Sequence, residues 1–95
     1  MYSERILSFG NKLKGRLEGS LLEGALGYVK CNEESLALEI LCDHISEYDV
    51  SLSNEEYEEI RLLIVDMGFD VGGAPFKYLQ GLITPIVEWS ENGTA

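Results

Sequence analysis

The chain has 95 residues, a formal net charge of −10 at pH 7 and two cysteines. Its length fits one domain, and its apolar content of 45% is that of a folded globule rather than a disordered chain. Two cysteines are too few for a disulfide scaffold, and the longest aliphatic run falls far short of the ~20 residues of a membrane helix. The N-terminus also lacks the features of a signal peptide. We therefore expect a soluble cytoplasmic protein that forms a single domain over residues 1–95.

The first thirty residues predict two helices. Apolar side chains recur at three- and four-residue steps over residues 3–18, as on one face of a helix. Ser20 and Glu23 have the spacing of a capping box and predict that a second, shorter helix begins there. Gly24 and Gly27 lie inside this second helix, either as flexible points or where another helix approaches closely, and we favour close approach.

The segment 33–70 holds twelve of the seventeen acidic residues and one basic residue, Arg61. Its first part predicts a helix over residues 33–48, with an apolar seam formed by Leu38, Leu41, Cys42 and Ile45. Three acidic residues follow one another at four-residue steps on the opposite face: Glu39, Asp43 and Glu47. Like charges at this spacing repel each other, so the helix tolerates a local destabilisation along this face.

The second part of the acidic segment predicts another helix, over residues 54–67. Ser53 and Glu56 form a capping box at its start, and Gly68 is placed to end it in a left-handed conformation. A short fifth helix is expected over residues 76–83, after a turn that ends in proline. Residues 86–89 are expected to dock as an extended segment, and the last few residues to fray.

These elements predict an all-α protein, a compact bundle of about four to five short helices. Three aromatic residues are expected to help close its core: Phe69, Tyr78 and Trp89. Two apolar residues lie off the inward stripe of helix 54–67 and predict that other elements cover it on more than one side: Leu62 and Val65.

The sequence contains no recognisable site for enzyme chemistry. Cys42 and His44 lie two residues apart, so on a helix their side chains point about 200° apart and do not form a nucleophilic pair. With Cys31 they do not match the usual spacing of zinc ligands. The carboxylates are expected on helical surface rather than in a cleft, where burial would raise their pKa. We therefore predict no catalytic residue, metal or cofactor, a buried structural Cys42 and a solvated His44.

The acidic surface itself is the remaining candidate site. Charge runs are often only solvated faces, and that interpretation stays open. The tolerated repulsion and the placing of Tyr48 beside Asp49 favour an interface, because tyrosine is a common anchor and surrounding charges speed encounter. A field of this sign favours a cationic protein partner and disfavours nucleic acid or an anionic membrane. The predicted binding residues are Glu39, Asp43, Glu47, Tyr48, Asp49, Glu55, Glu56, Glu58 and Glu59.

A family resemblance is carried by three stretches: residues 34–47, Leu52-Ser53-Asn54-Glu55-Glu56 and Met67-Gly68-Phe69-Asp70. They form a leucine-rich acidic helix, a loop and a second capped acidic helix. In this pattern the chain resembles small bacterial immunity proteins and is most similar to the MafI type, which accompanies the Maf polymorphic toxins. The likeness spans residues 4–83, and other immunity families share the pattern.

The resemblance implies a mostly helical antidote that binds the C-terminal toxin domain of a cognate Maf protein in the producing cell. Such domains are often nucleases, including RNases of the EndoU type, whose RNA-binding clefts are basic. An acidic antidote would present carboxylates where phosphates bind, and it would need no catalytic residue. Two alternatives stay open: an acidic module or nucleic-acid mimic that regulates a nucleic-acid-binding protein, and a small enzyme that uses surface carboxylates.

Overall fold

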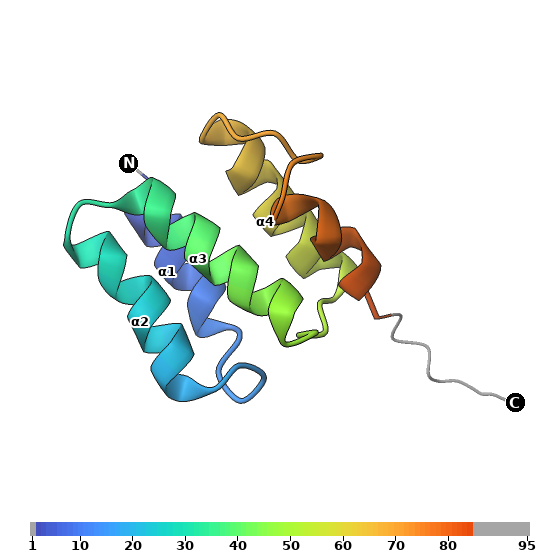
Figure 1. Ribbon diagram of the computed structural model, residues 1–95, viewed down its shortest axis with the longest axis horizontal. Helices are drawn as coiled ribbons and strands as arrows, with labels where there is room; N and C mark the ends of the chain where they lie inside the picture. The colour runs from blue at the N-terminus through green and yellow to red at the C-terminus, as the bar shows by residue number, and fades with distance from the viewer. Residues whose placement is uncertain (1, 85–95) are drawn as a thin grey trace, which may run out of the picture.

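A computed structural model of the chain describes residues 2–84 and confirms the predicted all-α bundle (Figure 1). Its helical segments are α1 (Ser3–Asn11), α2 (Gly19–Lys30), α3 (Glu34–Glu47), α4 (Asn54–Asp66) and the 3-10 helix η1 (Phe76–Leu82). Within residues 2–84, every helix is too short or too polar to cross a lipid bilayer. The predictions for residues 86–89, for Trp89 and for a frayed end lie outside the described residues.

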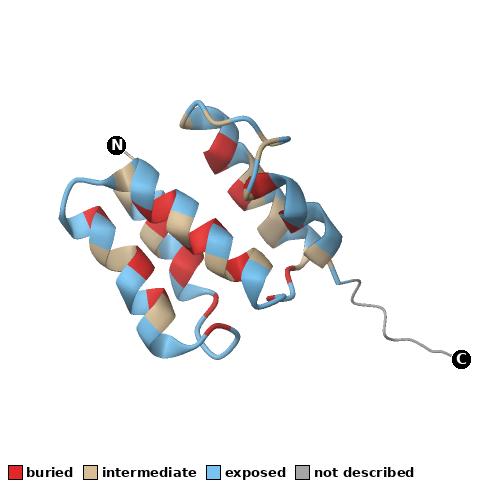
Figure 2. Cartoon of the chain, viewed as in Figure 1, coloured by how far each residue is buried: buried red, intermediate tan, exposed pale blue. Residues whose placement is uncertain are grey.

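The helices pack around a single core. α2 lies along α3, while α1 contacts α2, α3 and α4. η1 packs against α3 and α4, so α4 joins the bundle through α1 and η1 rather than through broad contact with α3 (Figure 1). The buried faces of the helices point inward (Figure 2). The core includes Ile6, Phe9, Leu22, Ala25, Leu38, Leu41, Ile45, Ile60, Leu63 and Leu79.

The first helix ends earlier than predicted, at Asn11 rather than near residue 18. The chain turns instead, and Gly15 adopts a φ of +88°, a conformation that glycine reaches without strain. Leu13 and Leu17 are still buried, and the Leu17 N–H donates to the Leu13 carbonyl at 3.1 Å. The apolar spacing that predicted a longer helix is therefore satisfied by a turn that returns both leucines to the core.

α2 begins at Gly19, and its cap differs from the predicted capping box of Ser20 and Glu23. The Glu18 carboxylate accepts hydrogen bonds from the Ser20 hydroxyl and from the N–H groups of Ser20 (3.1 Å) and Leu21 (3.2 Å). These hydrogen bonds, the Ser20 hydroxyl foremost, hold the pKa of Glu18 below its ordinary value. The prediction was wrong because Glu18, which precedes the helix, already accepts from the free N–H groups at its start. Its negative charge is also favourable at the N-terminal end of the helix dipole.

The glycine contact predicted for α2 occurs at a different residue. A Cβ atom at Gly10 of α1 would come within 2.7 Å of Leu26 Cδ2, so α1 and α2 approach closely there. A Cβ atom at Gly24 or Gly27 would meet nothing within 4 Å. The favoured interpretation, that these two glycines admit a neighbouring helix, is therefore wrong for the described part of the chain.

α3 and α4 agree with their predicted bounds to within about one residue. The cap expected at Asn32 is wrong, because α3 starts after Glu33, whose side chain makes no capping hydrogen bond, whereas the cap of α4 follows the sequence. The Ser53 hydroxyl accepts from the Glu56 N–H at 3.0 Å, and the Glu56 carboxylate accepts from the Ser53 N–H at 2.9 Å. This is the predicted capping box. Gly68 ends α4 with a φ of +89°, also as predicted.

Two predictions about burial are wrong. Leu62 and Val65 are 44% and 46% exposed, so α4 is covered on one side only. Tyr78 is 53% exposed because the short η1 buries Phe76 and Leu79 instead. Phe69 is half-buried, and its ring lies 5.0 Å from the ring of Phe76.

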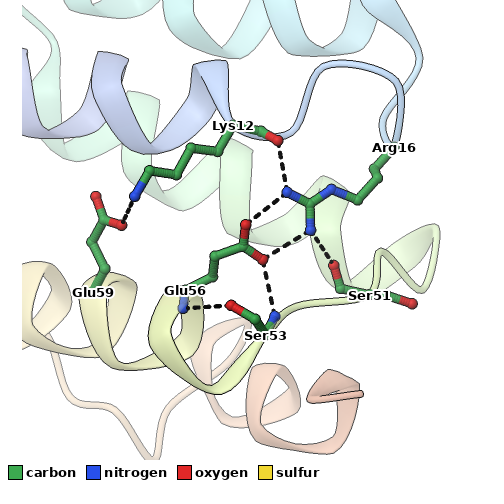
Figure 3. A network of polar contacts seen from close by, with 6 residues as sticks. All are labelled: Lys12, Arg16, Ser51, Ser53, Glu56 and Glu59. Carbon is green, nitrogen blue, oxygen red and sulfur yellow. Dashed lines mark hydrogen bonds and ion pairs between the residues drawn. The ribbon is translucent and has the colours of Figure 1, made fainter. Parts of the chain in front are cut away.

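Glu56 is the centre of a polar network between α4 and the turn after α1 (Figure 3). The Arg16 guanidinium donates to both oxygens of its carboxylate, at 2.8 and 2.7 Å, and also to the carbonyl oxygens of Ser51 and Lys12. Together with the capping box, these contacts lower the pKa of Glu56 to about 2, the Arg16 hydrogen bonds being the largest cause. A bidentate pair of this kind is stronger than an ordinary surface ion pair.

Two further ion pairs join α1 and the turn after it to α4. Lys12 Nζ lies 2.6 Å from a Glu59 carboxylate oxygen (Figure 3), and Arg5 lies 3.0 Å from Asp66. The hydroxyl of Tyr2 also donates to the Asp66 carbonyl at 2.9 Å. Cations at the start of the chain therefore neutralise carboxylates of α4, and they fix how α4 sits on α1.

Replacement of Glu56 by glutamine is expected to lower the free energy of unfolding by about 1–2 kcal/mol at pH 7. The pKa of Glu56 is lower in the folded state than its ordinary value of 4.5, so the ionised form favours folding. This stabilisation is complete above about pH 5 and is lost as the pH falls toward 2. Urea denaturation between pH 7 and pH 2 should therefore show a steeper loss for the wild type than for Glu56→Gln.

Glu58→Gln is the matched control, because within residues 2–84 the exposed Glu58 pairs only with Arg61, one turn along the same helix. It should leave both the stability and its pH dependence nearly unchanged. Equal pH profiles for the wild type and Glu56→Gln would contradict the assigned role of Glu56.

Candidate protein-binding surface

α3 places its acidic residues on the face opposite its seam. The four predicted seam residues are all fully buried, while Glu39, Asp43 and Glu47 are exposed. Among residues 2–84, none of these three carboxylates forms an ion pair or a hydrogen bond with another side chain. The helix therefore displays a row of negative charges that the described chain does not neutralise.

The C-terminal end of α3 gathers several polar groups. Donor atoms of Asp43, His44 and Glu47 all lie within 4.8 Å of one another. The ring of Tyr48, a residue that is 54% exposed, lies 6.3 Å from the His44 ring. Asp49 follows in a left-handed conformation with a φ of +51°, which aspartate tolerates better than most residues. Four of the predicted binding residues thus lie together at one end of α3.

His44 differs from its prediction. It is half-buried rather than solvated, because it faces the neighbouring α2. Its Nδ1 atom is buried and has no hydrogen-bond partner among the described residues. With Asp43 and Glu47 it forms a donor set that suits a cationic group arriving from outside. All three donors come from one side of a single helix, so a metal ion there would depend on water for its remaining ligands.

The predicted binding residues on α4 have a different environment. Glu56 and Glu59 pair with Arg16 and Lys12, and Glu58 pairs with Arg61. Glu55 alone of the four is exposed without such a partner among residues 2–84. The acids of α4 are thus largely engaged within the fold, whereas Glu39, Asp43 and Glu47 of α3 are available.

A groove between α2 and α3 was not predicted. It has a volume of about 440 Å³ and is lined by Ser20, Leu21, Gly24, Ala25, Gly27, Tyr28, Cys31, Ile40 and His44. Two features of the sequence could have indicated this groove: Ile40, which widens the apolar side of α3, and the two glycines inside α2. Tyr28, at 37% exposure, adds an accessible aromatic ring to the groove.

Another hollow adjoins Asp49. It is lined by Ser46, Asp49, Tyr78, Gly81 and Leu82. Tyr48 and Tyr78 are both more than half exposed, and Asp49 directly follows one and shares this hollow with the other. Tyr78 was expected in the core, so the sequence did not reveal this second exposed aromatic residue.

The two cysteines have different environments. Cys42 is fully buried, as predicted, and burial raises the pKa of its thiol, which disfavours the reactive thiolate. Cys31 is exposed and lines the groove together with His44. No hydrogen bond joins Cys31 to His44 within the described residues, and the prediction that the chain acts without catalysis stays a prediction.

Comparison of the chain with protein-family models, with curated proteins and with solved structures found no match. The resemblance to MafI-type immunity proteins therefore rests on the sequence pattern alone.

Replacement of Asp43 by asparagine is expected to raise the free energy of unfolding by about 0.2–0.5 kcal/mol at low salt. The substitution removes repulsion between Asp43 and its neighbours Glu39 and Glu47, one turn away on either side. Urea denaturation should show the gain in free energy of unfolding in dilute buffer. The gain should be smaller at 1 M salt, where the Debye length is only about 3 Å and the repulsion between the carboxylates is screened. Glu23→Gln is the control, since no acidic residue lies three or four positions from Glu23. A loss of stability in Asp43→Asn would show that this carboxylate contributes to the fold.

Proposed function

We propose that this chain acts by binding a cationic protein through the exposed face of α3 and the adjoining loop. The surface comprises Glu39, Asp43, Glu47, Tyr48 and Asp49. More specifically, the proposed activity is that of an immunity protein, which neutralises a cognate toxin domain with a basic surface, such as a nuclease. The sequence pattern supports this assignment by its resemblance to MafI-type proteins.

The proposal rests mainly on one observation: the exposed carboxylates of α3 and those of α4 differ in whether they form ion pairs. Those of α4 mostly meet cations of the same chain, whereas Glu39, Asp43 and Glu47 of α3 have no such partner among residues 2–84. A row of repelling charges lowers the stability of the helix that carries it. Its retention on a surface with exposed Tyr48 is explained if a positively charged partner neutralises it.

The mechanism follows from the geometry of α3. Successive acids of the row are four residues apart, which is about 6 Å along the helix axis. A rigid row of negative charges can occupy a cleft that otherwise holds the phosphates of a nucleic acid. Complementary charge speeds the encounter, and burial of aromatic anchors such as Tyr48 slows dissociation. Inhibition then needs no chemical step.

Growth of a bacterial host tests the function directly. The protein encoded by the neighbouring open reading frame is produced with and without this chain, from separately controlled promoters. Growth arrest by the neighbouring protein, relieved by this chain, is the expected result. If the neighbouring protein is not toxic and the chain instead co-purifies with a nucleic-acid-binding regulator, the nucleic-acid mimic is the better hypothesis.

Charge reversal then tests the surface. The double variant Asp43→Lys, Glu47→Lys should slow association with the toxin domain by about tenfold or more at low salt. Stopped-flow fluorescence at low and high salt measures this rate, and circular dichroism verifies folding. Asp49 is left unchanged, because its left-handed backbone disfavours lysine.

The matched control reverses two acids of α4, Glu55→Lys and Glu58→Lys, with the same change in net charge. It should reduce the association rate much less than the α3 variant does. Equal effects of the two double variants would show that total charge, and not the α3 surface, attracts the partner.

A further inference from the structure

We propose that the groove between α2 and α3 is the docking site for an amphipathic helix of the cationic partner. A large apolar side chain of that helix would lie over Gly24, and a lysine or arginine would meet Asp43 and Glu47. The inference rests on the proposed function in so far as the partner is the toxin domain. It adds apolar contacts to the acidic α3 surface of the proposed function.

Two glycines of α2 leave space on the side of the groove. Glycine inside a helix costs roughly 1 kcal/mol relative to alanine. At Gly10 a close contact with Leu26 accounts for the absence of a side chain, whereas a Cβ atom at Gly24 or Gly27 would meet nothing within 4 Å. Both of these glycines line the groove. Within the described chain nothing uses the space that they leave open, which suits occupation from outside.

The lining and the size of the groove suit an apolar ligand. Leu21 and Tyr28 of α2 face Ile40 and His44 of α3 across it, so its walls are mainly apolar. Its volume of about 440 Å³ lies within the range of roughly 300–1,000 Å³ typical of binding sites. A hydrophobic groove between two helices is a common receptor for the apolar face of a third helix.

Negative charge lies at the edge of the groove. His44 lines the groove, and donor atoms of Asp43 and Glu47 lie within 4.8 Å of a nitrogen of its ring. Neither carboxylate has an ion-pair partner among residues 2–84. An apolar floor beside two unpaired acids is complementary to a helix that carries leucine-like residues on one face and lysine or arginine beside them.

The same charge disfavours two other occupants. Residues 85–95 contain Glu88 and Glu91 and no lysine or arginine, so they do not complement the acidic edge. A second copy of this chain carries a net charge of −10, and mutual repulsion opposes self-association through an acidic rim. A cationic helix of a different protein is the occupant that both the apolar lining and the charge favour.

The native cysteines provide the test. Cys31 lines the groove and is exposed, whereas Cys42 is fully buried, so N-ethylmaleimide reacts selectively at the groove. The probe is a synthetic amphipathic helix of leucine and lysine, and its control is the same peptide with glutamate in place of lysine. Buffers contain EDTA, which removes any metal ion. At a peptide concentration of about ten times Kd, occupancy should slow alkylation of Cys31 roughly tenfold. The glutamate peptide should give no protection.

The variant Gly24→Leu separates docking in the groove from attraction by charge alone. Leucine is a better helix former than glycine and has free space there, so the variant should fold with unchanged or higher stability. It should raise the Kd for the lysine peptide by about tenfold, a loss of about 1.4 kcal/mol of binding free energy. Gln80→Leu is the matched control, because it places the same side chain at an exposed position of η1, outside the groove. Equal protection of Gly24→Leu and wild type, or protection by the glutamate peptide, would overturn the inference.

The toxin domain distinguishes failure of the groove from failure of the function. If the wild type and Gln80→Leu relieve growth arrest while Gly24→Leu does not, both proposals stand. If all three relieve it equally, the groove is not the docking site, although the immunity function holds. If none of the three proteins relieves growth arrest, the proposed function fails, and the peptide experiment alone decides the docking inference. Protection of Cys31 that rises with protein concentration in the absence of peptide would indicate self-association and would also overturn it.

Discussion

Three cations at the start of the chain pair with three carboxylates of α4, and this pairing determines which acidic residues of the surface remain unpaired. Arg5, Lys12 and Arg16 meet Asp66, Glu59 and Glu56, which lie 40 or more residues away in sequence. α4 has little direct contact with α3, so these ion pairs and the apolar contacts of α1 and η1 hold it in the bundle. Most of the carboxylates of α4 are consequently paired, whereas Glu39, Asp43 and Glu47 of α3 have no ion-pair partner among residues 2–84. A sequence that looks uniformly acidic over residues 33–70 thus folds into one helix whose carboxylates are mostly paired and another that exposes three unpaired ones.

This division separates the residues that maintain the fold from those proposed to recognise a partner. Glu56 is tied to a capping box and a bidentate arginine, so its loss disturbs the helix start and the contact with the turn after α1. Asp43 and Glu47 have no such ties among residues 2–84, and their replacement leaves the core untouched. A surface of this kind can change its charge pattern over evolution with little loss of stability. Immunity proteins that must follow changes in their toxins would benefit from that independence.

The fold could be predicted where local chemistry decides. The seam of α3, the capping box of Ser53 and Glu56 and the left-handed Gly68 each depend on residues within a few positions, and all were predicted correctly. The end of α1 could not be predicted, because the spacing of Leu13 and Leu17 suits a helix and a turn equally well. The cap of α2 was missed because glutamate is an unusual capping residue. For the site, the sequence showed which residues are acidic but not which ones pair, since pairing depends on packing between distant segments. The groove was missed for the same reason.

The loop between α3 and α4 is held in place along its whole length. The Val50 N–H donates to the Ile45 carbonyl at 3.0 Å, and Val50 and Leu52 are both buried. Leu52 also exchanges backbone hydrogen bonds with Leu82 and Thr84 at 3.0 and 2.8 Å, and Arg16 binds the Ser51 carbonyl. The neighbouring Tyr48 and Asp49 therefore stand on a scaffold whose conformational entropy has already been lost on folding. A ligand that meets them gains contact energy without having to order the backbone, which is the thermodynamic advantage of a preorganised receptor.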